Sequence, residues 1–284
     1  MTQIIQALSD IAPSYDALFC DLWGCLHNGQ TVYPPAIAAL RQFKASGGYV
    51  VLMTNAPRPS PAIITGFARL GITPDAYDIV VSSGDAALSA LNAGMVGQNV
   101  YHLGPEKDLS LFENAPAITR VPLAQAQGIV CTGPFFEETE TPQDYRGTFL
   151  VAKSRGLKLL CANPDLVVDL GDKRIYCAGA LAQLYDEMGG ESLYFGKPHP
   201  PIYDLARGRI AQYGINDDRI LCVGDGIGTD IKGGVAEGLD TLFITGGISV
   251  DAFGPDPQSP DPALLTAWLH DQSLSPTATI GRLR

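Results

Sequence analysis

Phe19-Cys20-Asp21-Leu22-Trp23-Gly24-Cys25-Leu26 is the most informative stretch of the chain, because it places a carboxylate directly after an apolar run. The residues before Asp21 predict a buried strand, and Gly24 predicts a turn. Open α/β sheets hold their reactive groups at the carboxyl ends of their strands, so Asp21 is a candidate nucleophile. An isolated Asp at such a place could equally cap the next turn, and the choice depends on the rest of the chain.

Two further motifs have polar groups beside apolar runs. Val50-Val51-Leu52-Met53-Thr54-Asn55 predicts a second buried strand that ends in a hydroxyl and an amide, groups that suit phosphate oxygens. In Tyr194-Phe195-Gly196-Lys197-Pro198-His199-Pro200, one Lys follows an apolar pair between Gly and prolines. An ammonium held there could neutralise an incoming phosphoryl group.

The fourth motif is Ile220-Leu221-Cys222-Val223-Gly224-Asp225-Gly226-Ile227-Gly228-Thr229-Asp230, a strand that runs into a Gly-rich turn with two carboxylates. Clustered Asp oxygens are the ligands that Mg²⁺ prefers. Each motif alone has an ordinary explanation in turn formation or helix capping. Their order along the chain and their common position at strand ends favour a single site.

The four motifs in this order resemble those of the haloacid dehalogenase superfamily, most of whose members are Mg²⁺-dependent phosphatases that work through an aspartyl-phosphate. The resemblance extends to subfamily IIA, the NagD-like and p-nitrophenylphosphatase-like predicted sugar phosphatases, and it covers nearly the whole chain. The strings that resemble this subfamily are the turn from Gly24 to Gly29, Ala162-Asn163-Pro164-Asp165, Gly196-Lys197-Pro198 and Thr229-Asp230-Ile231.

The resemblance implies a role for each matching residue. Asp21 would attack the phosphorus, while Thr54, Asn55 and Lys197 would hold the phosphoryl oxygens. The metal ligands implied for Mg²⁺ are Asp21, the backbone carbonyl of Trp23, Asp225 and Asp230. Asn163 and Asp165 are candidates to contact the rest of the substrate because their string follows an expected strand and Asp165 can accept hydrogen bonds, with a plain Pro-Asp turn as the alternative.

Trp23 departs from the pattern of the resembled phosphatases, which have a second Asp two residues after the nucleophile. A carboxylic acid in that role contributes roughly 10² to 10⁴ in rate, and indole cannot transfer protons in its place. His27 is the nearest titratable group and a candidate acid/base, although a loop His with local hydrogen bonds is the alternative.

The loss of this Asp leaves two other functions open. One is a non-catalytic protein that binds a phosphorylated ligand in a regulatory role. The other is a phosphonatase-like hydrolase, which would need a reactive Lys in a desolvated or cationic environment. The candidate lysines, whose sequence contexts look like those of ordinary solvated side chains, are Lys107, Lys153, Lys158 and Lys173.

Strand-like and helical stretches alternate, which predicts an α/β fold with a Rossmann-like parallel-sheet core. The core strands are expected at 16–20, 49–54, 78–82, 193–196, 219–223 and 240–245, with helices such as 35–46 and 200–213. Strands at 99–103, 128–131 and 158–161 and a helix at 141–155 predict an inserted α/β cap of type IIA. The expected domains are a core of 1–85 and 192–284 and a cap of 86–191.

Composition narrows the class of protein. The 284 residues have a net charge of −11 without a Lys/Arg cluster, which argues against a nucleic-acid partner. No segment approaches the roughly 18 apolar residues of a membrane span. Six cysteines without metal-site spacing predict buried reduced thiols. We expect a cytoplasmic protein that acts on a small phosphorylated substrate, with a homodimer as one assembly to test.

Overall fold

The computed structural model describes residues 2–284. The chain divides into two compact units. The first unit comprises the residues up to Thr54 together with Ile64–Val81 and Tyr203–Arg284, and the second comprises Asn55–Ile63 and Ser82–Ile202. The core and cap bounds expected from the sequence stay a prediction. Within residues 2–284, no helix has both the length and the apolar character needed to cross a membrane.

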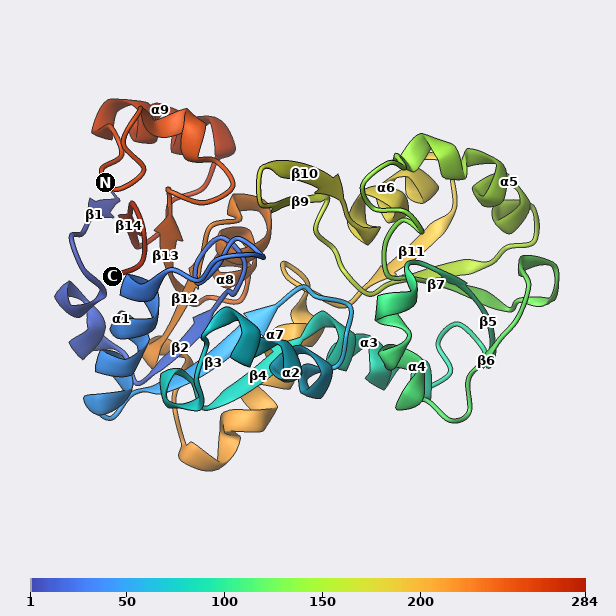
Figure 1. The fold of residues 1–284 in the computed structure, drawn as a ribbon, viewed down its shortest axis with the longest axis horizontal. Coiled ribbons are helices and arrows are strands. Elements are labelled where there is room, and N and C mark those ends of the chain that lie inside the picture. Colours follow the sequence, from blue (N-terminus) through green and yellow to red (C-terminus); the bar gives the residue numbers. More distant parts are fainter. Residues whose placement is uncertain (1) are drawn as a thin grey trace. The chain divides into compact units, whose positions relative to one another are not determined.

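A seven-stranded sheet forms the centre of the first unit (Figure 1). The strand order is β1-β14-β13-β12-β2-β3-β4. Residues of β2 and β12 are buried throughout, as expected for strands covered on both faces. The strands are β1 (Gln3–Ile4), β2 (Ala17–Cys20), β3 (Tyr49–Thr54), β4 (Ile79–Ser82), β12 (Ile220–Gly224), β13 (Asp240–Ile244) and β14 (Ala278–Ile280).

Register places the polar strand ends together. Strand β2 pairs in parallel with both β3 and β12, with Cys20 opposite Leu52 and Val223. Asp21 follows β2 and Asp225 follows β12, so both lie at the same edge of the sheet. This edge is where the sequence predicted the site, because parallel strands end on the same side.

Helices connect the strands of this sheet. Helix α1 begins with two prolines, a residue that suits the first turn because the missing N–H has no intrahelical partner there. At the start of α9, Asp261 accepts hydrogen bonds from the backbone N–H groups of Ala263 and Leu264. The helices are α1 (Pro34–Ala45), α2 (Ser60–Leu70), α7 (Pro200–Ile210), α8 (Lys232–Ala236) and α9 (Pro262–Gln272), of which α2 and α7 pass from one unit to the other along the chain.

The second unit has its own parallel five-stranded sheet in the order β11-β8-β7-β5-β6. An antiparallel hairpin of β9 (Val167–Leu170) and β10 (Lys173–Tyr176) follows β8 along the chain. The sheet strands are β5 (Asn99–Leu103), β6 (Thr119–Arg120), β7 (Gly128–Cys131), β8 (Lys158–Cys161) and β11 (Glu191–Tyr194). The helices are α3 (Ser83–Asn92), α4 (Ser110–Glu113), α5 (Arg146–Ser154) and α6 (Ala178–Glu187).

One predicted strand belongs to a different sheet. The run expected at 193–196 in the first sheet is β11, which pairs with β8 in the second sheet, with Leu193 opposite Leu160. A three-residue turn after α6 returns the chain beside β8, so the short connection decides the pairing. The strands expected at 99–103, 128–131 and 158–161 are confirmed.

Candidate active site

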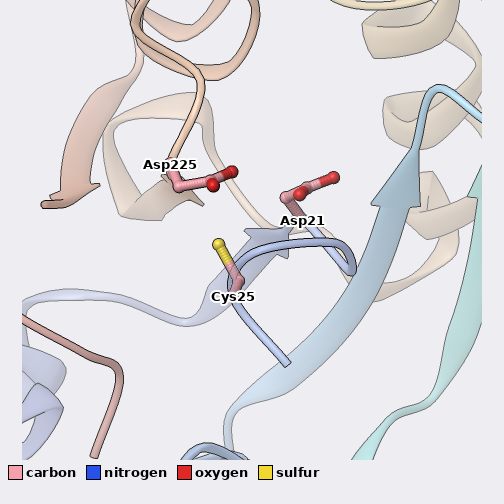
Figure 2. Close-up of side chains that lie close together, drawn as sticks. All are labelled: Asp21, Cys25 and Asp225. Atoms are coloured by element: carbon pink, nitrogen blue, oxygen red, sulfur yellow. The ribbon is translucent and has the colours of Figure 1, made fainter. Parts of the chain in front are cut away.

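Two buried carboxylates and a thiol lie close together at the carboxyl ends of the central strands β2 and β12 of the first sheet (Figure 2). One ligand atom each from Asp21, Cys25 and Asp225 lies within 4.8 Å of the other two. Asp21 is 7% exposed, and its backbone N–H donates to the carbonyl oxygen of Val223 at 2.8 Å, which ties the end of β2 to β12. The two acids therefore come from neighbouring strand ends, about 200 residues apart in the chain.

Glycine packing and a backbone hydrogen bond hold the Asp225 carboxylate. Gly24 has a φ of +78°, and a Cβ there would collide with that carboxylate. Gly247 approaches the same group from another loop, where a Cβ would also collide. The backbone N–H of Ile248 donates to Asp225 Oδ2 at 2.7 Å. A side chain at either glycine would occupy the space that this carboxylate fills.

Asp230 lies in a π-helical turn, Ile227–Ile231, that directly follows the β12 loop. π-Helical turns are rare in proteins, and those that occur often lie at functional sites. The carboxylate of Asp230 is buried and accepts a hydrogen bond from the backbone N–H of Gly226 at 3.0 Å. A Cβ on Gly224 would collide with the same side chain. Asp230 thus packs against the loop that carries Asp225.

The donor set at this edge fits Mg²⁺. Asp21 and Asp225 offer hard oxygen ligands from two elements, and Mg²⁺ is commonly held by one or two carboxylates with water completing the shell. Two acids buried side by side without a cation would repel each other. The ligand role of the Trp23 carbonyl stays a prediction, and the indole side chain is partly buried.

The second unit brings together four other residues that the sequence singled out. Asn55 Nδ2 donates to Asp165 Oδ1 at 2.8 Å and to the Lys197 carbonyl oxygen at 2.9 Å. Asn55 Oδ1 accepts from the Lys197 backbone N–H at 2.7 Å. Asn163 Oδ1 accepts from the Asp165 N–H at 3.1 Å. The Asn55 amide therefore ties two distant loops to each other, and Lys197 is 3% exposed.

His27 lies in the loop after Asp21. Its Nδ1 accepts a hydrogen bond from the backbone N–H of Gly29 at 2.9 Å, so the neutral ring carries its proton on Nε2. The ring meets the Trp23 indole edge to face, with centroids 5.3 Å apart. Burial lowers the pKa of His27 to about 4, so the imidazole is neutral near pH 7. A role of His27 in proton transfer stays a prediction. Thr54 is the last residue of β3, and phosphate binding by its hydroxyl also stays a prediction.

All six cysteines are free and buried, as the sequence predicted. What the sequence did not indicate is that Cys25 faces the acid pair. Burial, and then the charges of Asp225 and Asp21, raise the pKa of its thiol well above the usual value. The available signal was position alone: Cys25 follows Asp21 by four residues across the tight Gly24 turn.

Comparisons with known proteins agree with this architecture. A haloacid dehalogenase-like hydrolase model matches residues 18–116, and a second HAD-like hydrolase model matches residues 194–266. The chain is 25% identical to the ribonucleotide monophosphatase NagD of Escherichia coli K12, over 82% of this chain and 88% of that protein. A dihydroxyacetone phosphatase of Corynebacterium glutamicum is 32% identical, but the match spans only 34% of either chain.

Solved structures extend the likeness to the whole chain. A glycerol phosphate phosphatase of Mycobacterium tuberculosis, solved in complex with magnesium, has a TM-score of 0.64 at 24% identity over 85% of this chain and 71% of that one. A haloacid dehalogenase-like family hydrolase from Brucella suis is 39% identical over 99% of this chain and 100% of its own length, with a TM-score of 0.87. With that identity across both full lengths, and with a NagD relative, this chain belongs to the haloacid dehalogenase-like hydrolases, in the NagD-like and p-nitrophenylphosphatase-like subfamily IIA.

Proposed function

We propose that this enzyme is a Mg²⁺-dependent phosphatase that hydrolyses a small phosphorylated metabolite through an aspartyl-phosphate. The observation that supports this most directly is that Asp21 and Asp225 lie together, buried, at the carboxyl ends of neighbouring strands. Gly24, which has no side chain, leaves the space that the Asp225 carboxylate fills. Phosphatase relatives and the magnesium complex of the M. tuberculosis protein support the same reaction.

In the proposed reaction, a carboxylate oxygen of Asp21 attacks the phosphorus in line, and the bond to the leaving oxygen breaks. Water then hydrolyses the acyl phosphate and regenerates the Asp21 carboxylate. Bound Mg²⁺ would neutralise charge on the phosphoryl oxygens. Asp21, the Trp23 carbonyl, Asp225 and Asp230 would hold the ion or orient its ligands.

Phosphate binding is proposed for Thr54, Asn55 and Lys197. The hydrogen bonds of Asn55 to the Lys197 backbone fix the start of the Lys197 loop, so its ammonium starts from a defined position. A positioned cation stabilises the negative charge of the phosphoryl group in the transition state of its transfer. Asn163 and Asp165, tied to the same network, are proposed to contact the non-reacting part of the substrate.

Trp23 favours a second candidate, a protein that binds a phosphorylated ligand without turning it over. The indole leaves the acid pair intact but removes the usual proton donor. The phosphonatase-like alternative finds less support, because the candidate lysines are exposed. Three of them pair with a glutamate and one donates to a backbone carbonyl: Lys107 with Glu137, Lys158 with Glu191, Lys173 with Glu138, and Lys153 with the Met188 carbonyl.

Phosphate release distinguishes these functions. Sugar phosphates, nucleotides and p-nitrophenyl phosphate are offered to wild type and to Asp21→Asn, each with Mg²⁺ or with EDTA. We expect Mg²⁺-dependent release by wild type and none by the variant. If folded wild type binds Mg²⁺ but releases phosphate from no substrate, the phosphatase proposal fails and the binding function takes its place. Release that survives in Asp21→Asn would exclude Asp21 as the nucleophile.

A further inference from the structure

Cys25 is a soft ligand at a site otherwise made of hard oxygen ligands. Its Sγ points toward Asp225 (Figure 2), and it lies within 4.8 Å of a carboxylate oxygen of both Asp225 and Asp21. We propose that Cys25 is a third side-chain ligand, through which thiophilic divalent cations such as Cd²⁺ or Zn²⁺ bind this site in competition with Mg²⁺. This inference rests on the metal site of the proposed function and adds a cation selectivity to it.

The distances are close to those of one ion. Zinc binds thiolate sulfur at about 2.3 Å and carboxylate oxygen at about 2.0 to 2.2 Å, so two such ligands of a tetrahedral ion are about 3.6 Å apart. The ligand atoms of Asp21, Cys25 and Asp225 lie within 4.8 Å of one another. Side-chain rotations that bring these atoms roughly 1 Å closer would complete a sulfur and two-oxygen set, with water or the Trp23 carbonyl as a fourth ligand.

The position of Cys25 differs from that of the other thiols. Among residues 2–284, this trio is the one group of three potential metal ligands at such distances, and it includes one cysteine of six. Buried cysteines usually act as small apolar side chains, and the thiols of Cys20 and Cys161 donate to nearby backbone carbonyl oxygens. Cys25 is 1% exposed, yet it lies against two carboxylates and not only against apolar groups.

Ligand chemistry predicts how the site would discriminate between Mg²⁺ and thiophilic cations. Mg²⁺ takes oxygen ligands and gains nothing from sulfur, so Cys25 stays a thiol beside it. A thiophilic ion exchanges the thiol proton for a metal–sulfur bond, and the proton leaves to solvent. The bound ion gains one ligand that Mg²⁺ cannot use. Cd²⁺ or Zn²⁺ would then compete with Mg²⁺ for the two carboxylates.

Cadmium titration tests the proposal without any turnover. Wild type, Cys25→Val, Cys25→Ser and the control Cys131→Ala are titrated with Cd²⁺, and the thiolate-to-cadmium charge-transfer band is recorded in the ultraviolet. Cys131 is an equally buried thiol in the second unit, far along the chain from the acid pair. We expect a band that saturates at one equivalent in wild type and in Cys131→Ala, and that is absent from both Cys25 variants.

Competition and affinity locate the site. Excess Mg²⁺ should suppress the wild-type band, and Asp225→Asn should weaken it. Cd²⁺ affinity should fall in Cys25→Ser by at least the roughly 10- to 100-fold that loss of an outer-shell partner costs, while Mg²⁺ affinity changes little. Circular dichroism of each variant confirms that it is folded, and the serine variant covers the case in which valine disturbs the fold.

Three results would overturn the proposal: no band in wild type, a band that persists in folded Cys25→Ser, or a band that Mg²⁺ cannot suppress. The outcome is separate from that of the proposed function. A protein that shows the Cys25 band but releases no phosphate would retain this site and lose the phosphatase proposal. A phosphatase without the band would do the reverse.

Discussion

At the scale of single residues, Trp23 stands where the resemblance implied a proton-transferring Asp, and we expect it to limit the rate of turnover. The acid pair, the glycine contacts around Asp225 and the hydrogen bonds of Asn55 are all present in the structure. Substitution of Trp23 tests whether the site is otherwise complete.

We expect Trp23→Asp to raise turnover of alkyl phosphates at least about tenfold, because a poor leaving group needs the protonation that an acid at this position supplies. Turnover of p-nitrophenyl phosphate should change much less, since its leaving group is stable as an anion. The measurement is kcat for both substrates with Mg²⁺. No gain on alkyl phosphates in a folded variant would mean either that another group, such as His27, already transfers the proton or that the site is built for different chemistry.

Asp108 is a buried carboxyl group in the second unit, after β5. Its side chain is 2% exposed, and Oδ1 lies 3.6 Å from Arg58 Nε without a hydrogen bond to it. Burial raises the pKa of Asp108 to about 6, against the opposing charges of Lys107 and Arg58. The folded protein thus holds this proton to a higher pH than the unfolded chain does.

The sign of the pH effect follows from that difference. Between about pH 4 and pH 6 the folded state binds more protons than the unfolded state, so Asp108 makes the free energy of unfolding fall as the pH rises through this window. A rise of about two pKa units corresponds to roughly 3 kcal/mol. We expect Asp108→Asn to flatten this part of the profile in urea unfolding, whereas Asp172→Asn, at an exposed position, should not. An unchanged slope in Asp108→Asn would contradict the assignment.

At the scale of elements, the turn between β2 and α1 joins backbone conformation to ligand placement. Gly24 adopts a positive φ and borders the Asp225 carboxylate, whereas Gly47, after α1, has a φ of +96° with no atom within 4 Å of an added Cβ. The two glycines share the backbone requirement but differ in surroundings.

Alanine at each glycine separates these effects. Both variants should lose about 1 to 2 kcal/mol of stability from the left-handed backbone. Gly24→Ala should lose more and should also bind Mg²⁺ more weakly, because the new methyl group displaces Asp225. Chemical unfolding and Mg²⁺ titration measure the two quantities. Equal behaviour of the two variants would show that the contact with Asp225 is unimportant.

At the scale of the whole molecule, a net charge of −11 and a buried acid pair predict that stability depends on cations. A ligand that binds only the folded state stabilises it by about 2.7 kcal/mol at one hundred times its Kd. We therefore expect Mg²⁺ to raise the Tm of wild type, and EDTA to reverse the rise.

Calorimetry of matched charge variants checks that the rise comes from the site. Asp225→Asn should lose the Mg²⁺ response, and its Tm without metal should equal or exceed that of wild type because a buried repulsion is relieved. Asp251→Asn removes the same charge from an exposed position and should keep the response. A response that is the same in both variants would indicate general screening.

Sequence pattern was enough to predict that the two acids of the pair follow neighbouring strands. Asp21 and Asp225 each follow an apolar run, and parallel strands end on one side of a sheet, so their meeting could be predicted from pattern alone. The same reasoning predicted three strands of the second sheet. It did not predict β1 or β14, because segments of two or three residues are too short to show a periodicity.

The contacts between distant segments could be read from the folded structure alone. It assigned β11 to the second sheet, linked Asn55 to Asp165 and Lys197, and turned the Cys25 thiol toward the acids. Asn55 meets partners 110 and 142 residues away, and the thiol direction depends on the turn at Gly24. Strand-end placement follows from local pattern, whereas contacts between distant segments follow from how the whole chain packs, which no local pattern records.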